Sequence, residues 1–248
     1  MKKQPQFPTE EVTLPSKGLL YPKESPLSKG VITMKYMTAK EEDILTNQNL
    51  IENGTVIDKL LQSLIITPIN YDDLLLGDKN AVLIAARILG YGKDYEFEHK
   101  GETHQADLTK VEDKSLNESL ILNNENKFFF TLPTAKKEVT FKLLTHGDEK
   151  AIANEMKGLK RLNKDSSSNV STRMKYMITS IGGDSETKTI REFVDNELLA
   201  RDARELRNYI AEVQPDIDLT HEYEDKNGDF VKITIPIGLN FFWPDTDI

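Results

Sequence analysis

The sequence predicts an α+β protein, with a mostly helical body and small antiparallel β hairpin elements. Apolar residues recur at helical spacing in two stretches, residues 35–92 and 146–213. Polar and apolar residues alternate between turn residues in two others, residues 93–145 and 214–248, which is typical of hairpins. Residues 1–34 precede these four segments as an arm that contains five prolines.

The first helical module, residues 35–92, opens with a clear start signal. Thr38 stands three residues before Glu41, the spacing at which the two side chains satisfy the free amides of a helix start. A second, amphipathic helix follows Gly54 and stops before Pro68. The module therefore begins with two helices that turn an apolar face to the core.

The third helix of this module is predicted to be the buried centre of the protein. Residues 79–89 are apolar nearly all round, with Asp78 as the expected N-terminal cap and Gly90 as the C-terminal end. Arg87 lies in this helix, and a buried guanidinium without a partner is costly. We therefore expect Arg87 to pair with a carboxylate or lie at the rim of the core, and we favour the structural pair over ligand binding.

The arm before the first helix has large apolar side chains on backbone that proline keeps extended. Residues 31–37, which lead from the arm into the first helix, read as a strand. The apolar side chains must pack either on the chain's own core, which is the first interpretation, or on a partner protein. The candidate partner-binding residues of the arm are Leu14, Leu19, Leu20 and Tyr21.

The region 93–145 is predicted to be rich in β structure. A first hairpin spans residues 95–108 with its turn at Lys100-Gly101-Glu102, and a second strand pair, 127–132 and 138–144, surrounds Pro133-Thr134.

Helical periodicity returns after Thr145. One helix starts there, a second runs from Val170 to Ile181 and stops at two glycines, and a short and a long helix follow before Pro215. Three arginines step along the long helix, where they either hold an anionic partner or form a solvated, salt-bridged face together with acidic neighbours. We favour the solvated face; the residues are Arg201, Arg204, Arg207, Asp202 and Glu205.

The C-terminal segment contains a hairpin and an aromatic tail. Asn227-Gly228 lies between two strand-like runs, and this dipeptide is a strong hairpin signal. Aromatic residues concentrate at binding hot spots, so the tail is a second partner-binding candidate, with packing on the chain's own core equally open. The tail candidates are Phe241, Phe242, Trp243 and Pro244.

Composition narrows the function. The 248 residues include no cysteine, which excludes disulfides and thiolate metal sites, and the formal charge of −9 argues against a general nucleic-acid coat. No run approaches the roughly 20 apolar residues that a membrane span needs, and no secretory signal follows Met1. We expect a protein of the cytoplasm in which it is made, with neither nucleic acid nor membrane as a partner.

No catalytic motif stands out, so we expect no enzyme and no cofactor. His99, His104 and His221 are candidates to share a metal if the two hairpins pair, although solvated strand residues are the favoured interpretation. Asp216 and Asp218 have the residue types of an acid and base pair, although Asp216 after a proline is more typical of a turn or cap.

Several blocks, taken together and in this order, resemble one protein family, the T4-type baseplate hub subunits of contractile-tailed bacteriophages. They cover nearly the whole chain. The blocks are LPSKGLLYP at 14–22, KYMTAKEEDILTNQNLI at 35–51, GDKNAVLIAARILGYGKDY at 77–95, LLARDARELRNYI at 198–210, PDID at 215–218 and FFWPD at 241–245.

This resemblance implies a non-enzymatic structural or assembly role in the central hub of a phage baseplate. The implied partners are other hub or tail proteins, and the implied locations are the host cytoplasm during assembly and the virion tail baseplate. The alternative is a transient tail-assembly chaperone that binds the tape-measure protein. The resemblance also implies paired cysteines in the two hairpins, as in many members of the family, here near residues 99–104 and 225–228. Because this chain has no cysteine, we predict no metal site.

Overall fold

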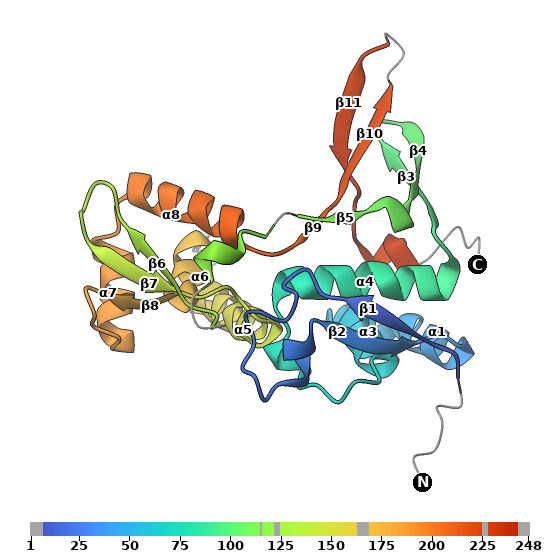
Figure 1. Cartoon of the computed structure of the whole chain (residues 1–248), viewed down its shortest axis with the longest axis horizontal. Helices are drawn as coiled ribbons and strands as arrows, with labels where there is room; N and C mark the ends of the chain where they lie inside the picture. The colour runs from blue at the N-terminus through green and yellow to red at the C-terminus, as the bar shows by residue number, and fades with distance from the viewer. Residues whose placement is uncertain (1–6, 115, 122–124, 163–168, 225–227, 243–248) are drawn as a thin grey trace.

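The computed structural model confirms the α+β class, because helices make up most of the body and all the described strand pairs are antiparallel in small sheets. Figure 1 shows two lobes side by side and an arm that projects above one of them. The structure describes residues 7–114, 116–121, 125–162, 169–224 and 228–242.

The first lobe, residues 7–92, packs a two-stranded sheet and four helices together. Its elements are β1 (Thr9–Thr13), β2 (Val31–Lys35), α1 (Ala39–Leu45), α2 (Gln48–Glu52), α3 (Val56–Leu64) and α4 (Leu76–Tyr91). The strand predicted at 31–37 is confirmed as β2. Its partner β1 lies in the proline-containing arm, where no strand was predicted, and pairs from Thr9 opposite Lys35 to Thr13 opposite Val31.

The predicted start of the first helix is confirmed. The Glu41 carboxylate accepts hydrogen bonds from the backbone N–H of Thr38 at 3.0 Å and from its hydroxyl at 2.6 Å. Helix α1 ends at Leu45. Asn47 then caps α2 by accepting a hydrogen bond from the N–H of Leu50 at 3.2 Å. This extra helix was not predicted, although asparagine is among the preferred capping residues.

Helix α4 is longer at both ends than the sequence predicts. It begins at Leu76, so Asp78 lies inside its first turn and is not its cap, and it ends at Tyr91, with Gly92 at a φ of +85° in the capping position predicted for Gly90. The early start brings Gly77 under the backbone of Pro215, whose carbonyl oxygen would lie 1.7 Å from a Cβ at that position.

The second lobe, residues 125–214, packs a three-stranded sheet against helices. Its elements are β6 (Phe128–Thr131), β7 (Glu138–Phe141), α5 (His146–Leu162), α6 (Asn169–Met177), β8 (Ile178–Ile181), α7 (Thr187–Asn196) and α8 (Ala200–Val213). The predicted helix 170–181 is wrong at its end. Ile178 pairs with Phe141 and Ile181 with Val139, so the β-branched residues after Met177 complete the sheet as β8.

The projecting part, which we call the hairpin arm, consists of residues 93–114, 216–224 and 228–235. It contains β3 (Asp94–His99), β4 (Glu102–Asp107), β5 (Glu112–Asp113), β9 (Ile217–Asp218), β10 (Thr220–Glu224) and β11 (Phe230–Thr234). The predicted turn at Lys100 and Gly101 is confirmed, with positive φ at both residues. The second hairpin is confirmed as β10 paired with β11, while Asn227 lies outside the described residues.

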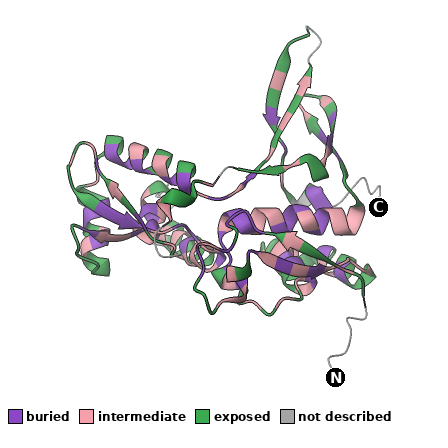
Figure 2. Cartoon of the chain, viewed as in Figure 1, coloured by how far each residue is buried: buried purple, intermediate pink, exposed green. Residues whose placement is uncertain are grey.

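The two lobes meet at a joint between the residues before α4 and the start of α5. The Leu76 N–H donates to the Leu144 carbonyl at 3.2 Å, and the His146 N–H donates to the Leu74 carbonyl at 2.8 Å. Figure 2 shows buried residues concentrated in the lobes, whereas Ile233 is the one buried residue of β10 and β11. Among the described helices, none is both long and apolar enough to cross a membrane.

Candidate interaction surfaces

The N-terminal candidates surround a buried carboxylate at the start of α4. Asp78 accepts hydrogen bonds from the Ser16 N–H at 2.9 Å, from the Ser16 hydroxyl at 2.6 Å and from the Tyr21 hydroxyl. The Tyr21 oxygen accepts in turn from the N–H of Leu75 at 2.9 Å. Burial raises the pKa of Asp78 above its ordinary value, and the hydrogen bonds from Ser16 and Tyr21 act in the opposite direction. This network fixes the arm to the first lobe.

The prediction that these residues of the N-terminal arm contact a partner protein is therefore wrong. Leu14, Leu20 and Tyr21 are between 1% and 3% exposed, and Leu19 is half-buried. Their side chains fill the first lobe because the buried hydrogen bonds to Asp78 hold the arm down. The first interpretation, packing on the chain's own core, describes these residues.

The C-terminal aromatic residues also lie inside the molecule. Phe241 and Phe242, in the short 3₁₀ helix η5 (Leu239–Phe242), are fully buried. The ring of Phe241 meets Tyr95 edge-on at 4.8 Å between centroids, beside the C-terminal half of α4. These two residues are not an exposed partner surface, because they close the core where the hairpin arm leaves the first lobe. Trp243 and Pro244 lie outside the described residues.

Three of the four histidines, His99, His104 and His221, lie in the two hairpins. The ring of His104 lies 4.2 Å from Tyr223, 5.6 Å from Phe97 and 6.1 Å from His221, and its Nε2 atom is buried without a hydrogen-bond partner. Burial first, and then His104, lower the pKa of His221. The favoured solvated interpretation is wrong for His104, which belongs to an aromatic cluster that joins the hairpins. Among the described residues, no three histidine or carboxylate side chains are placed to hold a metal.

The two aspartates after Pro215 have structural partners. Asp216 accepts hydrogen bonds at 2.9 Å from the Asn80 side chain and from the Ile217 N–H, and Asp218 accepts from the N–H of Thr220 at 2.9 Å. Asp216 thus ties the base of the hairpin arm to α4, which agrees with the turn interpretation of this residue.

Arg87 is buried without a carboxylate partner, so the predicted pair is wrong. Its guanidinium donates to the backbone carbonyls of Gly92 at 3.1 Å and Asp94 at 3.3 Å and lies over the rings of Tyr91 and Tyr95. Burial lowers the pKa of Arg87. The role is structural, as favoured, but carbonyl dipoles and aromatic faces replace the anion.

The arginine face of α8 is solvated as predicted, with one correction. Arg204 pairs with Glu205 at 3.1 Å on the surface. Asp202 instead points inward and accepts hydrogen bonds from the N–H groups of Thr134 at 2.7 Å and Ala135 at 2.9 Å. Burial acts against ionisation of Asp202, but the hydrogen bonds from Thr134 and Ala135, together with the charge of Arg201, outweigh it and lower the pKa. Asp202 holds the turn between β6 and β7, so it adds no negative charge to the outer face.

A titratable cluster that the sequence did not reveal lies at the joint between the lobes. Lys79 donates to Asp58 at 2.6 Å and contacts the Nδ1 atom of His146 at 3.2 Å, and the Tyr71 hydroxyl donates to Asp58 at 3.1 Å. Burial first, and then Lys79, lower the pKa of His146 against the opposing effect of Asp58. These residues are far apart in sequence, so no local pattern marks the cluster.

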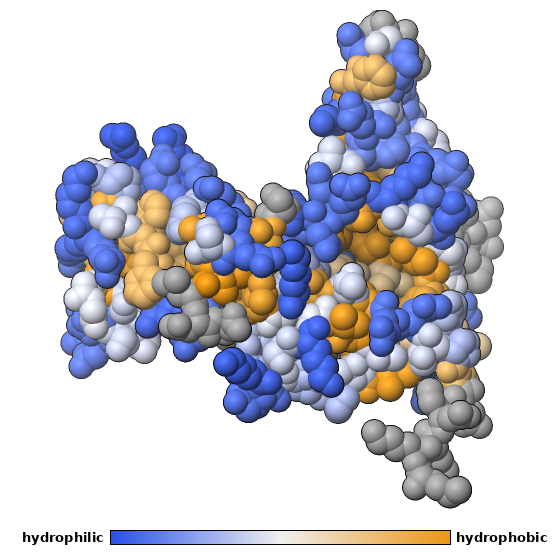
Figure 3. Space-filling view, viewed as in Figure 1, coloured by the Kyte–Doolittle hydropathy of each residue, from blue (hydrophilic) through white to orange (hydrophobic). Residues whose placement is uncertain are grey.

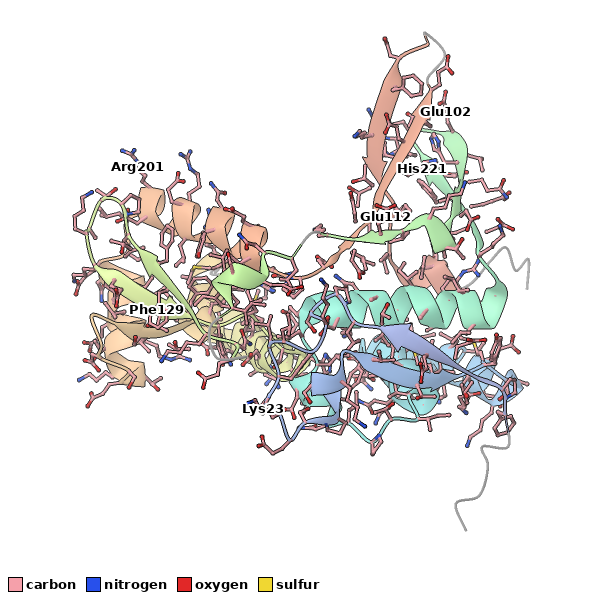
Figure 4. The ribbon with its side chains drawn as sticks, viewed as in Figure 1. Lys23, Glu102, Glu112, Phe129, Arg201 and His221 are labelled. Atoms are coloured by element: carbon pink, nitrogen blue, oxygen red, sulfur yellow. The ribbon has the colours of Figure 1, made fainter. Side chains whose placement is uncertain are left out.

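A concave site of about 390 Å³ lies where β5 and β9 meet the C-terminal end of α8. Acidic residues dominate its lining, and burial raises the pKa of Asp113. The lining residues are Glu112, Asp113, Lys114, Ala211, Glu212, Gln214 and Asp218. Figure 4 shows Glu112 at the base of the hairpin arm.

Large apolar side chains are exposed at places that the sequence did not single out. Phe230 is 74% exposed at the outer end of β11, and Figure 3 shows a hydrophobic patch near the tip of the arm among hydrophilic atoms. Phe129 on β6, Val170 on α6 and Leu199 before α8 are between 45% and 51% exposed in the second lobe. The alternating pattern of residues 229–235 is the one sequence signal that Phe230 is exposed, because it puts Phe230 on the same face of the strand as polar residues.

Comparison of the chain with protein-family models, with curated proteins and with solved structures gives no match.

Proposed function

We propose that this chain is a structural or assembly component of the central hub of a contractile-phage baseplate and that it acts through protein–protein contacts. The resemblance of blocks along nearly the whole sequence supports the family assignment. On this proposal the chain works in the host cytoplasm during assembly and in the virion tail baseplate, its partners are other hub or tail proteins, and it catalyses no reaction.

The observation that carries the proposal is Phe230 at the tip of the hairpin arm. A phenylalanine that remains 74% exposed gives up most of the roughly 2 kcal/mol that its burial would contribute. It stands on a two-stranded ribbon that projects above the first lobe, where a partner can reach it from several sides (Figure 1). An exposed aromatic residue on a projecting element suits an anchor at a protein interface.

The test is co-purification of the tagged full chain from phage-infected cells, followed by mass spectrometry of what is bound. Baseplate hub or tail proteins are expected with the wild-type chain and are expected to be lost with Phe230→Ser. Phe129→Ser is the matched control, since it removes an exposed phenylalanine from a strand of the second lobe. Capture of no tail protein by the wild-type chain would contradict the proposal.

Mass spectrometry of purified virions distinguishes a permanent hub component from a transient tail-assembly chaperone. A hub component is expected in the virion. A chain that is absent from virions but bound to the tape-measure protein in infected cells would instead be the transient tail-assembly chaperone.

A further inference from the structure

The outer face of α8 carries a row of three exposed arginines. Arg201, Arg204 and Arg207 recur at every third residue, while the opposite face of the helix is buried in the second lobe. With a rise of 1.5 Å per residue, the row covers about 9 Å of the helix. Arg204 pairs with Glu205 of its own helix, and neither Arg201 nor Arg207 forms an ion pair with another described residue. The row therefore has unused capacity to bind an anionic surface.

The macrodipole of α8 does not explain Arg201, the first residue of the row. Arg201 lies in the first turn of the helix, where the macrodipole favours anions and disfavours cations. The acidic residue of that turn, Asp202, points inward to the N–H groups of Thr134 and Ala135 and so leaves the outer face positive. A cation at a position where the helix dipole disfavours it is better explained by contact with an anionic partner than by the stability of the helix.

The hairpin arm has the opposite charge. Its described residues include twelve carboxylates against five lysines, which leaves a formal charge of −7. The carboxylates belong to Asp94, Glu96, Glu98, Glu102, Asp107, Glu112, Asp113, Asp216, Asp218, Glu222, Glu224 and Asp229, and the lysines are Lys93, Lys100, Lys110, Lys114 and Lys232.

Strand β3 presents part of this charge as a short ladder. Tyr95 and Phe97 point inward, so the alternation of the strand turns Glu96 and Glu98 outward, where both are exposed. Two residues of a strand span about 7 Å, close to the length of the arginine row. Neither Glu96 nor Glu98 forms an ion pair with another described residue.

Within one chain, the α8 helix and strand β3 lie in different parts of the molecule (Figure 1). Figure 4 shows Arg201 at the end of α8 that lies away from the hairpin arm, and Glu102 near the outer end of that arm. We propose that the arginine row of α8 docks on the acidic outer face of the hairpin arm of a second copy of this chain. Because each copy contributes a different surface, the contact is heterologous and builds a ring or a chain of copies. This self-association does not depend on the role proposed above.

The test is sedimentation velocity of the full chain at several protein concentrations, at about 50 mM and about 500 mM NaCl, which span strong and weak screening. Association is expected at low salt and is expected to weaken at least tenfold at high salt. A wild-type chain that stays monomeric at low salt and about 100 μM protein would overturn the proposal. Duplex DNA is added as a competing probe, and binding of DNA through the row by a chain that does not self-associate would also overturn it.

Charge reversal gives the sharper test. One variant carries Arg201→Glu, Arg204→Glu and Arg207→Glu, and a second carries Glu96→Arg and Glu98→Arg. Each is expected to lose self-association at least tenfold, whereas an equal mixture of the two recovers it, because each reversed surface then meets its complement on the other variant. Recovery requires both variants to be folded, so it separates docking from unfolding. Failure to recover, with both variants folded by circular dichroism, would overturn the proposal.

The matched control reverses three exposed cations at the end of α5, with Lys157→Glu, Lys160→Glu and Arg161→Glu. It changes the formal charge by the same amount as the α8 variant, and these residues lie on a different helix. Self-association of this control is expected to stay within about twofold of wild type. An equal loss in the control would show that net charge alone governs association and would refute docking through the row.

Discussion

The N-terminal arm and the hairpin arm contrast in regularity and in burial. Residues 14–30 are mostly turns, yet Leu14, Leu20 and Leu27 are between 1% and 3% exposed. Strands β10 and β11 are regular and fully paired, yet they contain one buried residue. The N-terminal arm, whose prolines suggest a loose tail, is part of the hydrophobic core. The hairpin arm, which has regular strands, projects away from both lobes (Figure 1).

The difference teaches that regular backbone pairing and tertiary burial are separate properties. A two-stranded ribbon satisfies its own hydrogen bonds and needs little from the rest of the chain beyond its aromatic cluster at His104. The irregular N-terminal arm cannot do this, and it depends on Asp78 for three of its hydrogen bonds. The two arms should therefore respond very differently to substitution.

The largest effect is expected at the buried carboxylate. Asp78→Ala leaves the N–H and hydroxyl of Ser16 and the hydroxyl of Tyr21 without their acceptor inside the first lobe. We expect a loss of about 4 kcal/mol in the free energy of unfolding, measured by urea denaturation. Asp73→Ala, at an exposed neighbouring position, is the control and should change stability by less than about 0.5 kcal/mol. Equal losses would mean that Asp78 does not hold the arm.

A slightly smaller loss is expected where Pro215, which leads into the hairpin arm, crosses α4. Gly77→Ala places a Cβ 1.7 Å from the carbonyl oxygen of Pro215, so α4 or the arm must shift. We expect a loss of about 3 kcal/mol by thermal or urea unfolding. Gly158→Ala is the matched control, because it lies in helix α5 with open space around the new methyl, and it should stabilise by about 0.5–1 kcal/mol. A neutral Gly77→Ala would contradict the close crossing of α4 and the arm.

Acidification should destabilise the hairpin arm and the joint between the lobes, because each contains a buried or partly buried histidine. The N-terminal arm contains no histidine, so this effect is absent there. The pKa values of His221 and His146 are lowered in the folded protein, mainly by burial, so the unfolded chain takes up protons more readily below pH 6.5. Stability present above pH 6.5 is therefore lost as the pH falls below it. Unfolding free energy measured between pH 5 and 7.5 should rise with pH, and His146→Gln and His221→Gln should each flatten the profile. A flat wild-type profile would refute this account.

The smallest effect is expected at the tip of the hairpin arm. Phe230 is 74% exposed, so Phe230→Ser removes little buried surface and should change the free energy of unfolding by less than about 0.5 kcal/mol. Phe242→Ser, at a fully buried phenylalanine, provides the contrast and should cost about 3 kcal/mol or more. If the two substitutions had similar costs in urea unfolding, the tip of the arm would be packed and the contrast between the arms would fail.

Elements with a local signal were predicted well, and elements that depend on distant partners were not. Thr38 and Glu41 lie three residues apart and start α1 as predicted, and the turn at Lys100 and Gly101 joins β3 to β4. The strand after Met177 was missed because its partner β7 lies about 40 residues earlier in the chain. Strand β1 was missed for the same kind of reason, since its proline-containing surroundings disfavour a strand locally.

The candidate sites show the same division. The sequence identified the right kinds of residue, aromatic and large apolar groups at the two ends, but not their burial. Whether Tyr21 faces solvent depends on Asp78, 57 positions away, and the environment of Phe241 depends on Tyr95. For Phe230, the alternation places it on the same face as polar residues, but only the structure shows that no described part of the chain covers this face.

The sequence by itself determined the α+β class, the caps and turns, and the separation into helical and hairpin segments, because hydrophobic periodicity and turn chemistry act over a few residues. Only the tertiary structure decided that Asp78, Arg87 and Asp202 are buried and what they contact. Their partners are distant residues, backbone groups and aromatic rings, and the cost of a buried charge depends on those surroundings and not on its sequence neighbours.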